Sequence, residues 1–489
     1  TARMLVAVGA IDNLGRARPP GRAVREPPCW ACPRLEGSNR SPYPCDANRP
    51  SKLQPHQPQQ KEAAMTDQPI AATHPAQGGV TAARGFRASG VHAGFRKDPE
   101  RLDLALVVAD EPCACAAVFT KNVFCSAPVI VSRAQLGADQ PGEPAYGTAR
   151  AVVVNSGNAN AATGEPGLEA ARETARIAGD AVGCPASEVL VASTGVIGVQ
   201  LPLAPFGTGL PAAASLLSAG GGADAARAIM TTDTRPKEAA VTFSGDGVGY
   251  DGCTFTVGGM SKGSGMIMPN MATMIAVLTT DAPVSAPALH RALVHAVNRS
   301  FNKVTVDSDT STNDSCFLFA SGAAAPAGAG AFDPDGPAFA RFQAALVEVC
   351  ETLARMMAAD GEGATRLVTV NVTGAANDAD ADLAARAVAN SPLVKTAVCG
   401  RDANWGRIAA AIGKSGAVFR QEDASIDIMG LPVCRGGLAQ AFDEDEALRR
   451  FEQPEIVIDV DLGAGEARTT VWTCDFTHEY ITINGDYRS

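Results

Sequence analysis

Aromatic side chains are scarce in this 489-residue chain, at 5% of residues, and no apolar run approaches the about 18 residues that a membrane helix requires. Net positive charge is also missing, since the formal charge is −11 at pH 7. A nucleic-acid partner requires a basic face, so this charge balance argues against that class of protein. With 46% hydrophobic and 19% charged residues, the composition is that of a soluble globular protein with a sizeable core.

Disulfide and metal-binding patterns are missing as well. The 13 cysteines are odd in number and scattered, many in apolar surroundings such as Val349-Cys350. This usage indicates reduced thiols that pack as small core residues in a cytoplasmic protein. Cys29 and Cys32 have CxxC spacing, but no second pair or histidine cluster follows at zinc-finger spacing. His290 and His295 lie five apart, whereas two metal ligands on one helix face lie three or four apart, so we predict no metal site.

The first 64 residues differ in composition from the rest of the chain. They contain ten prolines and eight arginines with almost no periodic apolar pattern, which is typical of a disordered tail. An organellar transit peptide remains open, although five acidic residues and many prolines fit poorly with an amphipathic targeting helix. The interpretation we favour is upstream sequence outside the working protein, with Met65 as the natural start.

Folded character begins near Gly78. Short apolar runs predict buried strands, and apolar residues at helical spacing predict helices. Because the two kinds of segment alternate irregularly, the sequence predicts a mixed α/β fold. Strands are expected at 104–108, 151–154, 273–280, 455–460 and 467–473, and helices at 168–182, 285–297 and 335–357.

The most unusual stretch, 257–281, is a Gly-rich loop that contains Lys262 and leads to a strand beginning at Thr273. A phosphate-binding P-loop is excluded because Gly263, not Ser or Thr, follows the lysine. A Thr hydroxyl is a weak nucleophile that needs an adjacent base. A cut between Ala272 and Thr273 would free an α-amino group of ordinary pKa about 7.7–8.0 beside that hydroxyl. The residues alone leave Thr273 open as either an ordinary strand residue or a nucleophile that supplies its own base.

The segment from Lys262 to Met274 resembles the processing site of the ornithine acetyltransferase family, which includes the bifunctional glutamate N-acetyltransferases of arginine biosynthesis. Further similar segments occur in order between about residue 78 and the end of the chain, whereas the first 64 residues match nothing in the family. These segments are Gly78–Thr81, Gly85–Arg87, Val118–Asn122, Asn155–Asn160, Ser193–Gly198, Thr231–Thr234, Asp307–Asp314, Asp360–Thr365, Asp402–Arg407 and Asn484–Ser489.

The resemblance implies a self-processing fold related to that of aminopeptidases, with sheets flanked by helices. The precursor would cut itself between Ala272 and Thr273 into an α chain, 65–272, and a β chain, 273–489. The β chain would include a smaller C-terminal domain from about residue 370. Two copies of each chain would form an α2β2 heterotetramer.

The resemblance also implies roles for individual residues. Thr273 is the nucleophile that takes the acetyl group, and Thr194 and Gly195 form the oxyanion hole. A hydroxyl and a glycine N–H can supply the two preorganised donors that a tetrahedral oxyanion needs. The implied substrate contacts are Thr234, Lys262, Thr273, Glu362, Asn484 and Ser489.

The implied function is acetyl transfer from N-acetylornithine to glutamate through an acetyl-Thr273 ester, with acetyl-CoA as a possible second donor. No metal or bound organic cofactor is implied, and the partners are small-molecule substrates and the chain's own fragments. Two alternatives stay open. One is an N-terminal-nucleophile aminopeptidase or amidase that passes the acyl group to water, and the other is a non-enzymatic scaffold that keeps the fold.

Overall fold

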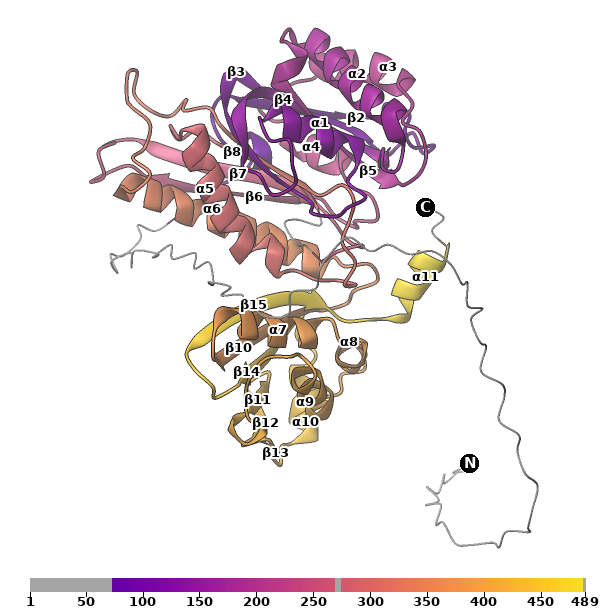
Figure 1. Ribbon diagram of the computed structural model, residues 1–489, viewed down its shortest axis with the longest axis vertical. Helices are drawn as coiled ribbons and strands as arrows, with labels where there is room; N and C mark the ends of the chain where they lie inside the picture. The colour runs from indigo at the N-terminus through magenta and orange to yellow at the C-terminus, as the bar shows by residue number, and fades with distance from the viewer. Residues whose placement is uncertain (1–72, 269–273, 487–489) are drawn as a thin grey trace, which may run out of the picture. The chain divides into compact units, whose positions relative to one another are not determined.

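The computed structural model describes residues 73–268 and 274–486, all within one compact unit that spans Gln68–Ser489. Strands and helices alternate along this part of the chain and form two sheets with helices packed on them (Figure 1). The predicted mixed α/β fold, with sheets flanked by helices, is therefore confirmed. The predicted tail, 1–64, and the residues Ala272, Thr273 and Ser489 lie outside the described residues.

The larger sheet has nine strands in the described part of the chain. They are β1 (His74–Pro75), β2 (Phe86–Val91), β3 (Leu104–Phe119), β4 (Ala145–Asn158), β5 (Val189–Val196), β6 (Lys237–Ser244), β7 (Thr254–Lys262), β8 (Ile275–Thr280) and β9 (Ser315–Ala320). Their order is β1-β6-β7-β8-β9-β3-β4-β5, with β2 beside β3. The pairs β4–β5 and β8–β9 are parallel, and the other pairs are antiparallel.

The central strands β8 and β9 are buried at every position because both faces of the sheet are covered. All six residues of β8 are buried, and successive side chains enter different cores. Ala276 and Leu278 join the core beneath α5 (Ala286–Arg299) and α6 (Pro337–Ala359), whereas Val277 joins the core on the opposite face. Successive residues of a strand point to opposite faces, so a strand covered on both sides is buried throughout. The two polar residues of β8, Thr279 and Thr280, donate through their hydroxyls to Val80 O and Thr256 O, each at 2.8 Å.

Helices cover both ends of the larger sheet. In Figure 1, α5 and α6 lie side by side, and α2 and α3 pack together at the other end of the sheet. Helix α5 packs against β3 and β4, and α6 packs against β6 and β7. The predicted helices at 168–182, 285–297 and 335–357 correspond to α2, α5 and α6, which confirms them. The remaining bounds are α1 (Ala127–Gln135), α2 (Gly164–Val182), α3 (Ala204–Ser215) and α4 (Gly222–Ala228).

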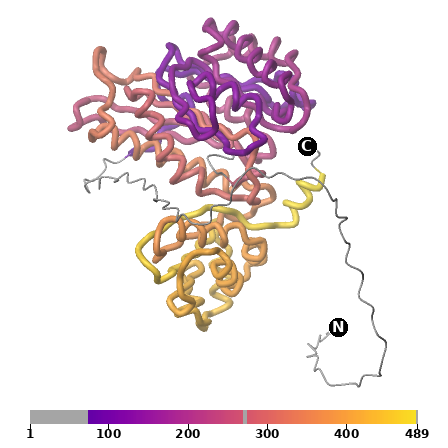
Figure 2. The backbone as a smooth tube through the Cα atoms, viewed as in Figure 1, coloured from indigo at the N-terminus to yellow at the C-terminus, as the bar shows by residue number. Residues whose placement is uncertain are grey.

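The smaller sheet begins at β10, and the C-terminal domain expected from about residue 370 stays a prediction because the described residues lie in one compact unit. Its order is β13-β12-β11-β14-β10-β15, and Figure 2 shows the last strand, in yellow, returning beside β10. The strands are β10 (Leu367–Ala375), β11 (Ser425–Ile428), β12 (Leu431–Arg435), β13 (Leu438–Ala439), β14 (Glu455–Asp461) and β15 (Ala467–Cys474). The helices are α7 (Asp378–Ala389), α8 (Pro392–Cys399), α9 (Trp405–Gly413), α10 (Glu444–Arg450) and α11 (His478–Asp486).

Candidate active site

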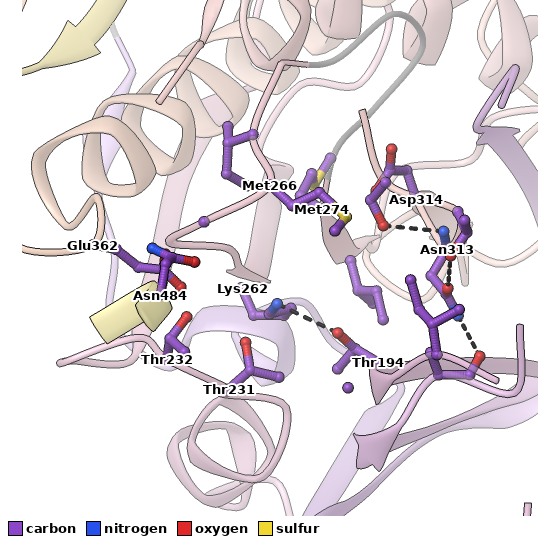
Figure 3. Close-up of a pocket in the computed structure, with 18 residues that line it drawn as sticks. Thr194, Thr231, Thr232, Lys262, Met266, Met274, Asn313, Asp314, Glu362 and Asn484 are labelled. Carbon is purple, nitrogen blue, oxygen red and sulfur yellow. Dashed lines mark hydrogen bonds between the residues drawn. The ribbon is translucent and has the colours of Figure 1, made fainter. Parts of the chain in front are cut away.

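One cavity of about 240 Å³ gathers polar residues from segments far apart in the chain (Figure 3). Thr194 and Gly195 come from the end of β5, Lys262 from the end of β7, and the others from loops and from α11. The cavity thus contains five of the residues that the family resemblance assigned to the site: Thr194, Gly195, Lys262, Glu362 and Asn484.

Gly195 lies where β5 passes very close to β4. Its φ is +135°, and a Cβ atom there would lie 2.3 Å from the backbone carbonyl carbon of Gly157. Only glycine fits this conformation and this approach, because an L side chain would clash with backbone that cannot rotate away. The two strands therefore hold the Gly195 backbone, including its N–H, in a fixed position at the cavity wall.

The Thr194 hydroxyl is oriented by Lys262. The Lys262 Nζ atom lies 3.4 Å from Thr194 Oγ1, and the ammonium can only donate in this contact. The hydroxyl oxygen is therefore the acceptor, and its hydrogen stays available to donate to a substrate oxygen. Together with the fixed Gly195 backbone, this geometry fits the predicted oxyanion hole.

Lys262 is buried, at 8% exposure, in a region of several charges. Burial lowers the pKa of its ammonium below the usual value, while the nearby Asp233, Asp314 and Glu362 carboxylates act in the opposite direction. In Figure 3 it lies between Thr194 and the Glu362–Asn484 pair. A cation here can bind the carboxylate of a small substrate.

Glu362 and Asn484 form a second polar group in the cavity. The Asn484 side-chain amide donates to Glu362 Oε2 at 2.7 Å, and the Glu362 backbone N–H donates to Ser264 O at 2.9 Å. Gly265 makes room for the carboxylate, since a Cβ atom at this position would lie 2.3 Å from it. A buried carboxylate at this point can accept from an ammonium group or assist proton transfer at an amine.

The loop that precedes the predicted cleavage site is held by Asp307. Its carboxylate accepts from the backbone N–H groups of Met266 and Ile267 at 2.6 and 2.8 Å. Met266 has φ +53°, a left-handed conformation that costs free energy in a non-glycine residue. Thr310 adds a hydrogen bond from its hydroxyl to Met268 O at 2.9 Å. The segment around Asp307 therefore fixes a strained wall of the cavity.

Three predicted site residues remain, Thr234, Thr273 and Ser489. Thr273 and Ser489 are not among the described residues. Met274, which follows Thr273, lines the cavity and accepts through its carbonyl from Ser315 N at 2.9 Å. Thr234 is bonded elsewhere, with its hydroxyl and its N–H both donating to the Asp360 carboxylate. The roles assigned to these three residues stay predictions.

Sequence reasoning gave no role to several residues that line the cavity. Thr231 and Thr232 were considered only as neighbours of Thr234, and the 307–314 run was noted without a function for its members. Asn313, in the loop before β9, donates to Ala159 O and Ser193 O at 2.6 and 2.8 Å, so it ties this loop to β5 and to the residue that follows β4. The available signal was the density of short polar residues in these two runs, which is unusual beside buried strands.

Membrane-spanning helices and metal clusters are both absent from the described residues. Within residues 73–268 and 274–486, every helix is too short or too polar to cross a membrane. The same residues contain no group of three or more His, Cys, Asp or Glu side chains arranged to hold a metal ion. The cavity combines hydroxyls, amides, one ammonium group and two carboxylates with apolar side chains such as those of Ile197, Met266 and Met274.

The protein thus has a mixed α/β fold with a small cavity that contains polar residues. Comparison with known proteins shows its family. The ArgJ family model matches residues 87–489. The arginine biosynthesis bifunctional protein ArgJ of Symbiobacterium thermophilum is 49% identical over 413 residues, which are 84% of this chain and 99% of that protein. The protein of the same name from Nitratidesulfovibrio vulgaris is 46% identical over 407 residues, 83% of this chain and 99% of that one.

A solved structure of ornithine acetyltransferase complexed with ornithine, from Mycobacterium tuberculosis, is also similar. It is 39% identical, with a TM-score of 0.36, and the match covers 41% of this chain and 100% of that chain. On the family model and the curated relatives, this chain belongs to the ArgJ family. The resemblance found in the sequence is therefore confirmed.

Proposed function

We propose that this protein is a glutamate N-acetyltransferase of arginine biosynthesis that moves acetyl from N-acetylornithine to glutamate. The observation that carries the proposal is the convergence of Thr194, Gly195, Lys262, Glu362 and Asn484 on one cavity. Its volume of about 240 Å³ is below the roughly 300–1,000 Å³ of pockets for drug-sized ligands, so it suits a substrate the size of an amino acid. Membership of the ArgJ family supports the same reaction.

The first step of the proposed chemistry is self-cleavage. The Thr273 hydroxyl attacks the carbonyl carbon of Ala272, the peptide C–N bond breaks, and the hydroxyl proton moves to the released α-amino nitrogen. Water then hydrolyses the new ester, which leaves Ala272 as a carboxylate and restores the Thr273 hydroxyl. The freed amine, with an ordinary pKa near neutral, becomes the base for the second reaction.

Acetyl transfer then follows in two half-reactions. The Thr273 hydroxyl attacks the acetyl carbonyl of N-acetylornithine, Thr194 and Gly195 donate to the oxyanion, and ornithine leaves with the hydroxyl proton on its amine. Glutamate's amine attacks the acetyl ester, which forms N-acetylglutamate and returns the proton to Thr273. Lys262 binds the substrate carboxylate, and Glu362 accepts from the amine that leaves or enters.

Several finer features belong to the same proposal. Acetyl-CoA is a possible second acetyl donor, and neither a metal nor a bound organic cofactor takes part. Thr234 and Ser489 contact substrate. The cleaved α chain, 65–272, and β chain, 273–489, assemble as an α2β2 heterotetramer in the cytoplasm.

A donor experiment tests the reaction. Purified protein is given glutamate with either N-acetylornithine or acetyl-CoA, and acetylglutamate and free ornithine are measured. Acetylglutamate from the first donor supports the proposal, and its formation from the second shows a two-donor enzyme. Ornithine release that does not depend on glutamate would contradict the transferase and favour the amidase alternative.

A second experiment tests the nucleophile. Intact-mass measurement of the wild-type protein should show two fragments that meet at the Ala272–Thr273 bond. The T273A variant should remain a single chain without acetyltransferase activity, because it lacks the hydroxyl for both steps. Cleavage of the variant at the same bond would rule out the self-cleavage mechanism.

A further inference from the structure

A buried group of charges lies next to the cavity without lining it. Lys237, at 1% exposure, donates to Asp233 Oδ1 and to Asp360 Oδ2, each at 2.6 Å. Arg235 adds a longer contact of 3.9 Å to Asp360. One ammonium cannot balance two buried carboxylates, and a buried charge is costly unless another charge compensates it. With Arg235 beside Asp360, the excess negative charge is on Asp233.

Asp233 also joins two walls of the cavity. Its carboxylate accepts from the backbone N–H of Gly263, which follows Lys262, at 2.7 Å. It accepts from the backbone N–H of Thr231, which lines the cavity, at 2.9 Å. A single side chain therefore fixes both the end of β7 and the segment before β6. These contacts stabilise the backbone on either side of the Lys262 ammonium.

The charge on Lys262 depends on its surroundings. Burial is the largest effect and lowers the pKa of the ammonium, so the neutral amine becomes accessible closer to neutral pH. The groups that face it are the Asp233, Asp314 and Glu362 carboxylates, which raise the pKa, and the Lys237 ammonium, which lowers it. Asp233 is the strongest of these charges. For Asp233 itself, burial raises the pKa, but Lys262 and Lys237 outweigh burial and hold the pKa below its usual range.

We propose that Asp233 is a positioning residue that keeps Lys262 charged and correctly placed to bind the substrate carboxylate. The inference rests on the proposed function, in which Lys262 takes that role. Glutamate and N-acetylornithine both carry an α-carboxylate, so both half-reactions depend on the Lys262 charge. Asp233 acts through Lys262 and touches no substrate itself.

The D233N variant tests this role because it removes the charge and nearly keeps the shape. KM for glutamate is measured from pH 6 to 9, normalised to the amount of cleaved chain. In the variant, Lys262 loses its proton at lower pH than in the wild type, so KM should begin to rise at lower pH. If the pKa of Lys262 falls by one unit, KM near pH 9 should rise about tenfold, whereas KM at pH 6 and kcat should change much less.

Two further variants make the test decisive. The D233N/K237M double variant removes one buried ammonium together with one buried carboxylate, so the net charge of the buried group is unchanged, and it is the variant to measure where D233N does not fold. Its acid shift in KM should be in the same direction as that of D233N but smaller, because Asp233 raises the pKa of Lys262 more than Lys237 lowers it. The matched control is D382N. Asp382 likewise pairs with a lysine, Lys303, at 2.7 Å, and with Arg386, but it does not line the cavity. Its KM profile should equal that of the wild type.

Failure of the proposed role of Asp233 can be told apart from failure of the proposed acetyltransferase function. A wild-type KM profile in folded D233N or D233N/K237M would overturn the role of Asp233. A uniform loss of kcat with an unchanged profile would overturn it too, since that is the effect of a purely structural residue. Failure of the proposed function looks different, because the wild-type protein itself would then transfer no acetyl to glutamate.

Discussion

Gly195 is the residue whose substitution is the most direct test of the oxyanion hole. In the G195A variant, the new methyl carbon would lie 2.3 Å from Gly157 C and 2.6 Å from Asn158 N, so the backbone of β5 must move. Displacing one oxyanion donor typically lowers kcat by about 10²–10³. We expect a loss of this size together with a lower thermal midpoint, so acetyl transfer is measured on the folded, cleaved enzyme.

The matched control for this prediction is G198A. Gly198 also has a positive φ, of +82°, but a Cβ atom there would have nothing within 4 Å. The control therefore carries the conformational strain of an alanine without the clash, and its kcat should remain within a few-fold of wild type. If G195A, once cleaved, turned over as fast as G198A, Gly195 would not be an oxyanion donor.

At the residue scale, the sequence predicted the chemical roles of individual side chains better than it predicted which residues would contact one another. Lys262 and Glu362 could be assigned by resemblance because their types and positions match a family pattern, and the cavity contains both. Asp233, between Thr232 and Thr234, could not be assigned. Its importance comes from Lys237 and Gly263, which pack against it only after β6 and β7 pair.

At the scale of elements, the loop before the predicted cleavage site depends on the 307–314 segment. The D307N variant replaces one carboxylate oxygen with an N–H₂ group, which cannot accept from both Met266 N and Ile267 N. The strained φ of Met266 would then lose part of its support. We expect self-cleavage to slow by about tenfold or more, the equivalent of one lost charge-assisted hydrogen bond, as followed on denaturing gels after expression.

The neighbouring Asp309 provides the control for that experiment. It belongs to the same polar run and is exposed, but its backbone N–H donates to Asp307 rather than to the loop. D309N should therefore be cleaved at the wild-type rate. Equal rates for D307N and D309N would mean that the contacts of Asp307 do not limit cleavage, whatever they contribute to stability.

The elements themselves were largely predictable because their patterns are local. The stripe of α6 and the apolar runs of β3, β4, β14 and β15 follow directly from side-chain periodicity, and the structure confirms them. Sheet order was not predictable, since β3 pairs with β2 over residues 104–109 and with β9 over residues 114–119. Such pairings depend on which faces are covered, and this information lies in distant parts of the chain.

At the scale of the whole molecule, the cavity is a product of long-range assembly. Lys262 and Glu362 are a hundred residues apart in sequence, and Asn484 comes from α11, which follows the last strand of the smaller sheet in the chain. The turn at Gly363 connects these parts, because a Cβ atom there would lie 2.6 Å from Tyr480 N in α11. Composition and periodicity contain no information about such contacts, so the family resemblance was the sequence signal that brought these residues into one site.

Buried cysteines predict how the stability of the whole molecule depends on pH. The structure describes ten free cysteines, of which Cys113, Cys115, Cys316, Cys350, Cys434 and Cys474 are buried. Burial raises the pKa of every one of these six thiols, that of Cys113 to about 12. A group whose folded pKa is raised contributes stability below its unfolded pKa, about 8.5 for Cys, and loses it as pH rises towards the folded value.

The free energy of unfolding should therefore fall steeply above about pH 8.5, by up to about 1.4 kcal/mol per pH unit for each buried thiol. The buried Lys262 and Lys395 act in the opposite direction, because burial lowers their pKa and folding then gains stability as pH rises. The effect of six thiols on the free energy of unfolding outweighs that of two amines, so urea midpoints measured between pH 7.5 and 10 should decrease.

The C350A variant tests the contribution of one thiol. It should be less stable than the wild type at pH 7.5, because of the small cavity it leaves, yet its free energy of unfolding should fall less between pH 7.5 and 10. Parallel pH curves for the two proteins would show that the Cys350 thiol ionises as readily in the folded chain as in the unfolded one.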